Sequence, residues 1–207
     1  MNPAPSNRKS GVSIAVIDYN AGNIASVGNA LRKLGFEYTI TKDPKEILAA
    51  DKVIFPGQGR AAAAMDDLRA SGLDKVIREI KKPFLGICLG LQLLFESSEE
   101  DDAQCLGIIE GRVKRFNEPD LKIPQMGWNI ISIVQNDPLI SGIPDKAYVY
   151  FANSYYGAGD NYALATSVYG STESGAIIRK DNFYGTQFHP EKSGEWGMKI
   201  LDNFCRL

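Results

Sequence analysis

Short apolar runs alternate with segments of helical spacing through the first half of this 207-residue chain, and no other feature restricts its fold as much. The apolar runs are rich in residues that favour strands and cover 12–19, 36–40, 52–55 and 84–87. The segments of helical spacing cover 24–34, 44–50, 61–69, 73–80 and 89–95. Strands that alternate with helices form right-handed βαβ units. We therefore expect an α/β fold with an open, mostly parallel twisted sheet and helices on both faces.

Two local signals mark helix ends in this half. Gly35 follows the first helical segment, where a glycine adopts the left-handed conformation that ends a helix. Asp43 precedes the second segment as an N-cap, and Pro44 occupies its first position.

The second half of the chain has shorter apolar runs separated by turn residues. These runs predict strands over 111–116, 129–134, 147–153, 162–168, 176–180 and 183–187, before a last helix over 195–205. No linker rich in Pro, Gly or Ser separates the halves, so we expect antiparallel additions to the same sheet within one domain over 12–207. Residues 1–11 are polar and predict a disordered tail.

Composition excludes several classes of function. With 23 Lys+Arg against 25 Asp+Glu and no basic block, the chain has no electrostatic footprint for nucleic acid or for a membrane surface. Three cysteines without a CxxC pair or a signal segment predict a reducing, cytoplasmic location. One histidine, His189, excludes zinc sites that need two or three imidazoles. We expect no metal and no cofactor.

The strongest chemical signal is the segment Gly86-Ile87-Cys88-Leu89-Gly90, here called the elbow. It has the G-x-nucleophile-x-G pattern, between a predicted strand and a predicted helix. A sulfur at a helix N-terminus is favoured as thiolate, and the N–H of Leu89 can donate to an oxyanion. A buried structural cysteine between packing glycines explains the pentapeptide equally well. Cys105 and Cys205 have weaker claims and are expected to be inert.

His189 stands two residues before Glu191, at the end of a predicted strand. In extended chain, residues i and i+2 face the same side, so Glu191 can accept from one imidazole nitrogen while the other faces a nucleophile. A surface salt bridge is the alternative, but His189 is the only imidazole that can serve Cys88.

A third signal is Pro56-Gly57-Gln58-Gly59, here called the PGQG loop, at the end of a predicted strand. Loops at the carboxyl ends of parallel strands line the ligand crevice, and Gly57 and Gly59 let backbone N–H groups turn towards a developing anion. An ordinary strand-to-helix turn is the alternative.

Taken together, these motifs resemble a known family. The segments GICLGLQ (86–92) and QFHPEKS (187–193), with the PGQG loop, resemble the class I, or triad, glutamine amidotransferases. A closer resemblance, to glutaminase subunits of imidazole glycerol phosphate synthases of histidine biosynthesis, rests on DYNAGN (18–23), PQMGWN (124–129) and GTQFHPEKSGEWG (185–197). The resemblance runs from about Val12 to the C-terminus.

The resemblance implies a flavodoxin-like, class I amidotransferase fold and a Cys88–His189–Glu191 triad that hydrolyses L-glutamine to glutamate and ammonia. Cys88 attacks, His189 moves the proton and Glu191 orients the imidazole. Backbone donors at Leu89 and in the PGQG loop (Gly57, Gln58, Gly59) would hold the oxyanion. The family binds glutamine through positions that correspond to Gln92, Ser154 and Tyr155.

The family also implies a partner, because its ammonia passes into a (β/α)8-barrel cyclase subunit of a heterodimer. The glutaminase pattern spans the whole chain and leaves no room for an ammonia-accepting domain. The interface positions implied by the family are Asn20, Asn23, Met126, Trp128 and Asn129. For Trp128 a place in the core is the alternative.

Two positions depart from the family pattern. Asn153 stands where a histidine commonly precedes Ser-Tyr, and Gln58 stands where a small apolar residue is usual. Other readings of the whole chain stay open at this point: a glutaminase for surface-sugar amidation or for pyridoxal phosphate synthesis, a non-catalytic scaffold, and a standalone cysteine hydrolase.

Overall fold

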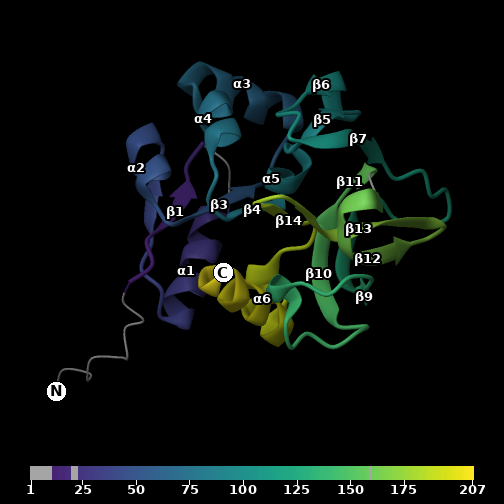
Figure 1. Cartoon of the computed structure of the whole chain (residues 1–207). Coiled ribbons are helices and arrows are strands. Elements are labelled where there is room, and N and C mark those ends of the chain that lie inside the picture. The colour runs from purple at the N-terminus through teal and green to yellow at the C-terminus, as the bar shows by residue number, and fades with distance from the viewer. Residues whose placement is uncertain (1–10, 20–22, 159) are drawn as a thin grey trace.

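The centre of the fold is an eight-stranded sheet with the order β2-β1-β3-β4-β14-β13-β12-β9, seen in the computed structural model of the chain (Figure 1). The structure describes residues 11–19, 23–158 and 160–207. Five strands are parallel: β2 (Thr39–Thr41), β1 (Ile14–Ile17), β3 (Lys52–Gly57), β4 (Phe84–Cys88) and β14 (Phe183–Thr186). Three are antiparallel: β13 (Thr172–Lys180), β12 (Ala163–Tyr169) and β9 (Ser132–Ile133). The expected mostly parallel sheet is thus confirmed, with antiparallel strands added at one edge.

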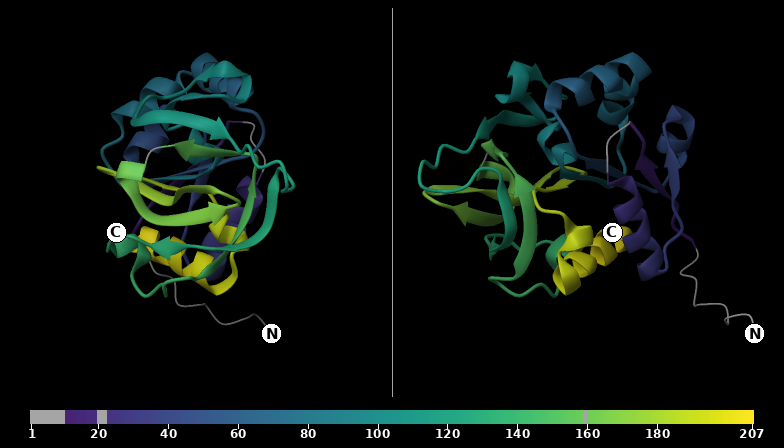
Figure 2. Two further views of the ribbon diagram at one scale, coloured as in Figure 1. Left: turned by 90° about the vertical axis from the view of Figure 1, so that its right-hand side faces the viewer. Right: turned by 180° about the vertical axis from the view of Figure 1, so that it is seen from behind.

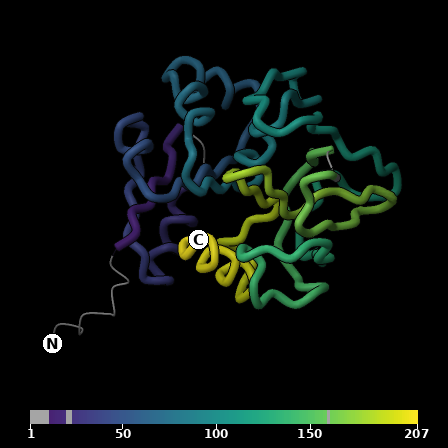
Figure 3. Tube along the Cα trace, in the orientation of Figure 1, coloured from purple at the N-terminus to yellow at the C-terminus, as the bar shows by residue number. Residues whose placement is uncertain are grey.

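Helices cover both faces of the parallel strands, as expected (Figure 1). On one face lie α1 (Ile24–Leu34) and α6 (Gly194–Arg206), which also contact each other (Figure 3). On the other face lie α2 (Pro44–Ala49), α3 (Ala61–Ser71) and α4 (Leu73–Glu79). Successive side chains of a strand point to opposite faces of the sheet. In β3, Ile54 packs in the cluster with α1, while its neighbours Val53 and Phe55 pack in the cluster with α3.

The predicted helix ends are confirmed. Gly35 is left-handed, with φ 82°, and its N–H returns to the carbonyls of α1. The Asp43 side chain accepts a hydrogen bond from the Lys45 N–H, and Pro44 begins α2.

The second half differs from the expectation of a single extended sheet. Only β9, β12, β13 and β14 join the large sheet. Two smaller sheets lie beside it (Figure 2). In one, β8 (Gln125–Ile130) pairs with β10 (Tyr148–Asn153). The other has the strand order β11 (Tyr155–Ala158), β7 (Ile109–Arg115), β5 (Phe95–Ser98) and β6 (Ala103–Gln104). In the described ranges, three short 3-10 helices connect strands: η1 (Glu100–Asp102), η2 (Pro138–Ile140) and η3 (Asp160–Tyr162). A fourth, η4 (Pro190–Lys192), lies between β14 and α6.

The helix that follows Cys88 is shorter than the predicted 89–95. It is the single turn α5 (Leu89–Gln92), and the chain then continues into β5. The carbonyl of Leu93 accepts from Leu106 N–H, and that of Leu94 accepts from Ile109 N–H, so the backbone bonds a continuing helix would need are taken by a neighbouring segment.

None of the helices in the described ranges is long and apolar enough to cross a membrane. The expected disordered tail, 1–11, lies outside the described residues except for Gly11.

Candidate active site

Three parallel strands bring the predicted site residues to one end of the sheet. In the register, Gly57 at the end of β3 is paired with Cys88 at the end of β4, and Ile87 is paired with Thr186 at the end of β14. His189 follows β14 by three residues. Because the carboxyl ends of neighbouring parallel strands meet, the PGQG loop, the elbow and His189 adjoin, as the sequence predicted.

Packing of its two glycines sets the conformation of the elbow. A Cβ on Gly86 would lie 2.7 Å from the Gly90 carbonyl oxygen, and a Cβ on Gly90 would collide with the Phe55 carbonyl oxygen. Between them, Cys88 is 7% exposed and has φ 55° and ψ −108°, a conformation that L-residues rarely adopt. Since α5 is one turn long, any favourable field at the sulfur comes from its local N–H groups rather than from a long helix.

His189 and Glu191 form a buried pair. His189 Nδ1 lies 2.9 Å from Glu191 Oε1, with side-chain exposures of 2% and 0%. Burial lowers the pKa of His189, but hydrogen bonds to Cys88 and Glu191 raise it more, and the resulting pKa is about 9. The imidazole thus links the thiol and the carboxylate and carries a proton at neutral pH.

A buried glutamine, which sequence analysis did not single out, lies next to the Cys88 thiol. Gln187 Nε2 lies 3.9 Å from Cys88 Sγ, and Gln187 Oε1 accepts a 3.1 Å hydrogen bond from Gln92 Nε2. Gln92 Nε2 also donates to the Tyr155 carbonyl oxygen at 2.9 Å. Gln187 stands two residues before His189 in the same extended segment, so period-two spacing could have placed it on the side of His189.

A cavity of about 300 Å³ opens over Cys88. Most of the predicted catalytic, oxyanion and glutamine-binding residues line it: Gln58, Gly59, Cys88, Leu89, Gln92, Ser154, Tyr155 and His189. Gly57 and Glu191 are not among the lining residues: Gly57 is paired with Cys88 at the end of β3, and Glu191 contacts His189 Nδ1. Four residues that were not predicted as site residues complete the lining: Glu100, Pro124, Ala152 and Asn153. Of these, Asn153 and Pro124 stand in segments to which the family resemblance draws attention.

Two of these additional residues have distinctive surroundings. The pKa of Glu100 is raised because the carboxyl is partly desolvated, although it accepts a 2.8 Å hydrogen bond from Ala61 N–H. Asn153 donates to the same Tyr155 carbonyl as Gln92, at 2.9 Å. Among the described atoms, Asn153 Oδ1 is buried without a hydrogen-bond partner.

The residues predicted for a partner interface fall in three places. Met126 and Trp128 lie on β8 and are 64% and 56% exposed, so a core position for Trp128 is wrong. Asn129, on the same strand, donates to the Val168 carbonyl oxygen at 2.8 Å. The Asn23 side chain contacts Glu191 and His189. Asn20 lies outside the described residues.

The other cysteines are buried away from the cavity. Burial raises the pKa of Cys105 to about 11, which disfavours its thiolate. Cys205 packs into the core with α6. Within the described ranges, no three His, Cys, Asp or Glu side chains are grouped closely enough to hold a metal ion.

Comparison with known proteins supplies a family for this geometry. The class-I glutamine amidotransferase family model matches residues 15–207. The imidazole glycerol phosphate synthase subunit HisH of Bacteroides fragilis (strain YCH46) is 50% identical over 198 residues, which cover 95% of this chain and 100% of that protein. The subunit HisH of Dehalococcoides mccartyi (strain CBDB1) is 49% identical, covering 94% of this chain and 97% of that protein.

Solved structures agree on the fold. A crystal structure of a glutamine amidotransferase superimposes with a TM-score of 0.72 at 18% identity, covering 95% of this chain and all of that one. The family model and the two HisH relatives span nearly the whole chain. The chain belongs to the class-I glutamine amidotransferase family, in its branch of imidazole glycerol phosphate synthase HisH subunits.

Proposed function

We propose that this chain is the glutaminase subunit of an imidazole glycerol phosphate synthase, and that Cys88, His189 and Glu191 are its catalytic triad. The observation that carries the assignment is the buried chain of contacts from Glu191 Oε1 through the imidazole to the thiol, which ends at the floor of the 300 Å³ cavity. This is the arrangement of nucleophile, base and orienting carboxylate that amide hydrolysis uses.

In the first half-reaction, the Cys88 thiolate attacks the side-chain amide carbon of glutamine. The carbonyl oxygen becomes an oxyanion, held by the Leu89 N–H and by backbone N–H groups of the PGQG loop. His189, protonated at neutral pH because its pKa is about 9, donates a proton to the leaving nitrogen, and ammonia departs from a thioester. Water, deprotonated by the now neutral His189, then adds to the thioester carbonyl carbon. The C–S bond breaks, glutamate leaves, and the Cys88 thiolate is regenerated beside the protonated imidazole.

Glutamine binding is assigned to Gln92, Ser154 and Tyr155 on the other side of the cavity. Both amide hydrogens of Gln92 have protein acceptors, on Tyr155 and Gln187. Its Oε1 is therefore the atom that can accept from the α-ammonium of the substrate. The network fixes this acceptor before the substrate arrives, which reduces the entropy that binding must remove.

The partner is proposed to be a (β/α)8-barrel cyclase that receives the ammonia. The exposed aromatic and methionine side chains of β8 and β10 support a docking face there, with Met126 and Trp128 joined by Tyr148, which is 61% exposed. Trp128 packs its ring edge-on to Tyr150 at 6.1 Å between centroids, which makes it a braced anchor. Pro124 and Ala152, on the same two strands or just before them, line the cavity, so a partner on this face would sit beside the site.

The decisive experiment measures glutamate release from glutamine by the full chain, alone and with the cyclase and its nucleotide ligand. We expect activity to be low alone and to rise with the partner and ligand, and the Cys88→Ala variant to show none. A glutamine-analogue electrophile should label Cys88 in the wild-type complex. Glutamate release by Cys88→Ala, or no labelling of Cys88 in the complex, would contradict the proposal.

A purification test addresses the acceptor. The chain should be recovered with the cyclase. Recovery with a barrel of pyridoxal phosphate synthesis, or with a sugar-amidating synthase, would keep the glutaminase chemistry and overturn the choice of partner.

A further inference from the structure

Asn23, the residue before α1, does not cap the helix with its side chain, although asparagine is a common capping residue. Asparagine is among the favoured N-cap residues, because its side-chain oxygen can accept from a backbone N–H of the first turn. Asn23 stands at that position with a left-handed backbone, φ 79°. Among the described groups, its side chain makes no capping bond to α1. The amide has another partner.

That partner is the triad carboxylate. Asn23 Nδ2 donates a hydrogen bond to Glu191 Oε1, the same oxygen that lies 2.9 Å from His189 Nδ1, and Asn23 Nδ2 is itself 3.4 Å from His189 Nδ1. Glu191 Oε2 is buried and has no hydrogen-bond partner among the described residues. One oxygen of Glu191 thus makes both contacts that hold the side chain, and Asn23 supplies one of them.

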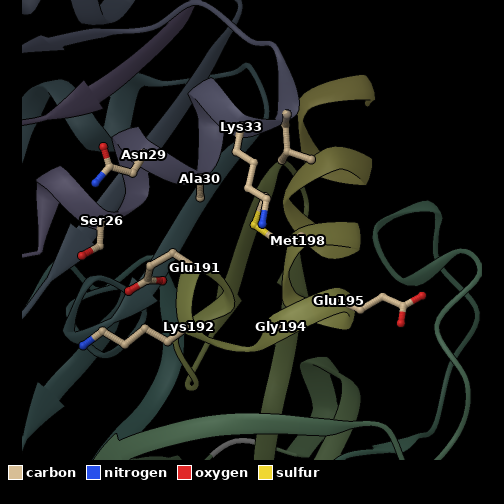
Figure 4. A pocket seen from close by; sticks show the side chains of 10 residues that line it. Ser26, Asn29, Ala30, Lys33, Glu191, Lys192, Gly194, Glu195 and Met198 are labelled. Carbon is tan, nitrogen blue, oxygen red and sulfur yellow. The ribbon is translucent and has the colours of Figure 1, made fainter.

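A pocket borders Glu191, although the side chain of this residue is fully buried. A pocket of about 790 Å³ between α1 and the segment from η4 into α6 is lined by Glu191, with Ser26 and Asn29 on the α1 side and Lys192 on the η4 side (Figure 4). A glutamate side chain has several rotatable bonds, so the contacts of its carboxylate decide whether Glu191 faces His189 or turns away from it. The amide of Asn23 opposes that movement.

We propose that Asn23 is a positioning residue of the triad, which holds Glu191 against His189 and so keeps the imidazole oriented towards Cys88. This inference rests on the proposed function. It adds to the three triad residues a fourth, Asn23, which lies near the N-terminal end of the sequence, far from His189 and Glu191. The α1 helix is thereby connected to the catalytic base through one side chain.

The test uses two substitutions that the left-handed backbone tolerates. Asn23→Gly removes the amide without adding backbone strain. Asn23→Asp keeps the shape but replaces the donor by a negative charge. The control is Lys146→Gly, which removes a side chain at another left-handed position, φ 63°, outside both pockets.

The first readout is the NMR titration of the single imidazole in the full chain, with any affinity tag removed. In Asn23→Gly, Glu191 spends less time against His189, so the midpoint should fall by about one pH unit. In Asn23→Asp, the added carboxylate beside the imidazole should raise the midpoint above that of the wild type. Lys146→Gly should leave it unchanged.

The second readout is glutaminase kinetics in the activated complex. Both Asn23 variants should lose about tenfold or more in kcat, with KM changed less than about twofold, because the base is misplaced while the glutamine-binding groups are intact. Midpoints equal to the wild type in both Asn23 variants overturn the proposal. So does an equal loss of kcat in Asn23→Gly and Lys146→Gly.

The titration separates this inference from the proposed function. If the wild type hydrolysed no glutamine under any condition, the function would fail, yet opposite midpoint shifts in the two Asn23 variants would still support the positioning role. If Asn23→Gly does not fold, the midpoint and kcat of Asn23→Asp decide the matter.

Discussion

The elbow and the PGQG loop lie side by side and both contain two glycines, but they are held in different ways. At the elbow, Cβ atoms on Gly86 and Gly90 would meet backbone, at Gly90 and at Phe55. In the PGQG loop, Gly57 is packed in the same manner, against Gly90 N at 2.7 Å. At Gly59, by contrast, a Cβ would find no described atom within 4 Å, and its φ is 109°.

This difference separates the two halves of the site. The proposed nucleophile, Cys88, has its position fixed by close contact of three backbone segments, so it cannot move without disturbing the core. The outer end of the PGQG loop depends on the backbone freedom of one glycine and can change conformation while the core stays intact. If the proposed roles hold, a preformed nucleophile faces an adjustable set of oxyanion donors.

The largest effect should come from Gly90→Ala. Its Cβ would overlap the Phe55 carbonyl oxygen, and a strand carbonyl in the middle of the sheet cannot give way cheaply. We expect a loss of about 3 kcal/mol in the free energy of unfolding, which for a chain of this size lowers the Tm by roughly 6–12 °C. Thermal unfolding followed by circular dichroism measures it.

A control separates crowding from backbone conformation. Gly72→Ala has the left-handed φ of 74° but open space for its Cβ, so it should cost only about 1 kcal/mol. If Gly90→Ala were no more destabilising than Gly72→Ala, the elbow would not be fixed by packing.

The second prediction concerns the pKa of His189, which we expect to depend on Cys88 in the elbow and not on Gly59 in the PGQG loop. Cys88→Ala should lower the titration midpoint of His189 from about 9, because it removes the hydrogen bond to the thiol while burial, which lowers this pKa, remains. Gly59→Ala should leave the midpoint within about 0.3 units, since it changes no charge. NMR of the single imidazole measures both.

The same shift has a consequence for stability. The folded-state pKa of His189 lies above its ordinary value of 6.5, so its contribution to stability is complete below pH 6.5 and is lost as the pH rises through about 9. Urea unfolding at both ends of this range should therefore show a smaller loss in Cys88→Ala than in the wild type. An equal loss in both proteins would mean that the thiol does not contribute to the raised pKa.

These two regions also show what sequence patterns can predict. The strands β3 and β4 and the turns that follow them were predicted, because strands buried on both faces are continuous apolar runs and because the glycines mark the turns. The helix after Cys88 was predicted too long. Leu93, Leu94 and Phe95 continue an apolar pattern, and only tertiary hydrogen bonds from residues 106–109 end the helix at Gln92.

Contacts between distant residues were beyond local patterns. Asn23 and Glu191 are 168 positions apart, and nothing near either residue indicates that their side chains meet. The family resemblance gives Asn23 a place in an interface, which stays a prediction, and it does not point to the contact of the Asn23 amide with Glu191. The strand β11 was missed for a related reason: Tyr155–Ala158 is short, and Gly157 is needed because the Phe95 ring occupies the space of a Cβ.

Gly59→Ala is expected to have the third largest effect. A φ of 109° is strained for any residue with a Cβ, at a cost of about 1–3 kcal/mol, which the free loop can relieve by changing conformation. We therefore expect a Tm within about 4 °C of the wild type. The kcat/KM should fall by about tenfold or more, because the relaxed loop misplaces its N–H donors. A large fall in Tm with normal kcat/KM per folded molecule would mean that Gly59 serves the stability of the fold and not the placement of the N–H donors.

The smallest effect should come from Gln58→Ala, next to Gly59. Gln58 is exposed at the rim of the cavity, so its truncation removes no packed atoms. The free energy of unfolding should stay within about 0.5 kcal/mol of the wild type, a Tm change of no more than about 2 °C. The kcat/KM should change less than in Gly59→Ala, since the backbone that carries the N–H groups keeps its glycine. Parallel thermal unfolding and glutaminase assays of the two variants test this ranking. A loss of stability in Gln58→Ala as large as that in Gly90→Ala would mean that the loop is packed as tightly as the elbow, and the contrast between the two regions would be wrong.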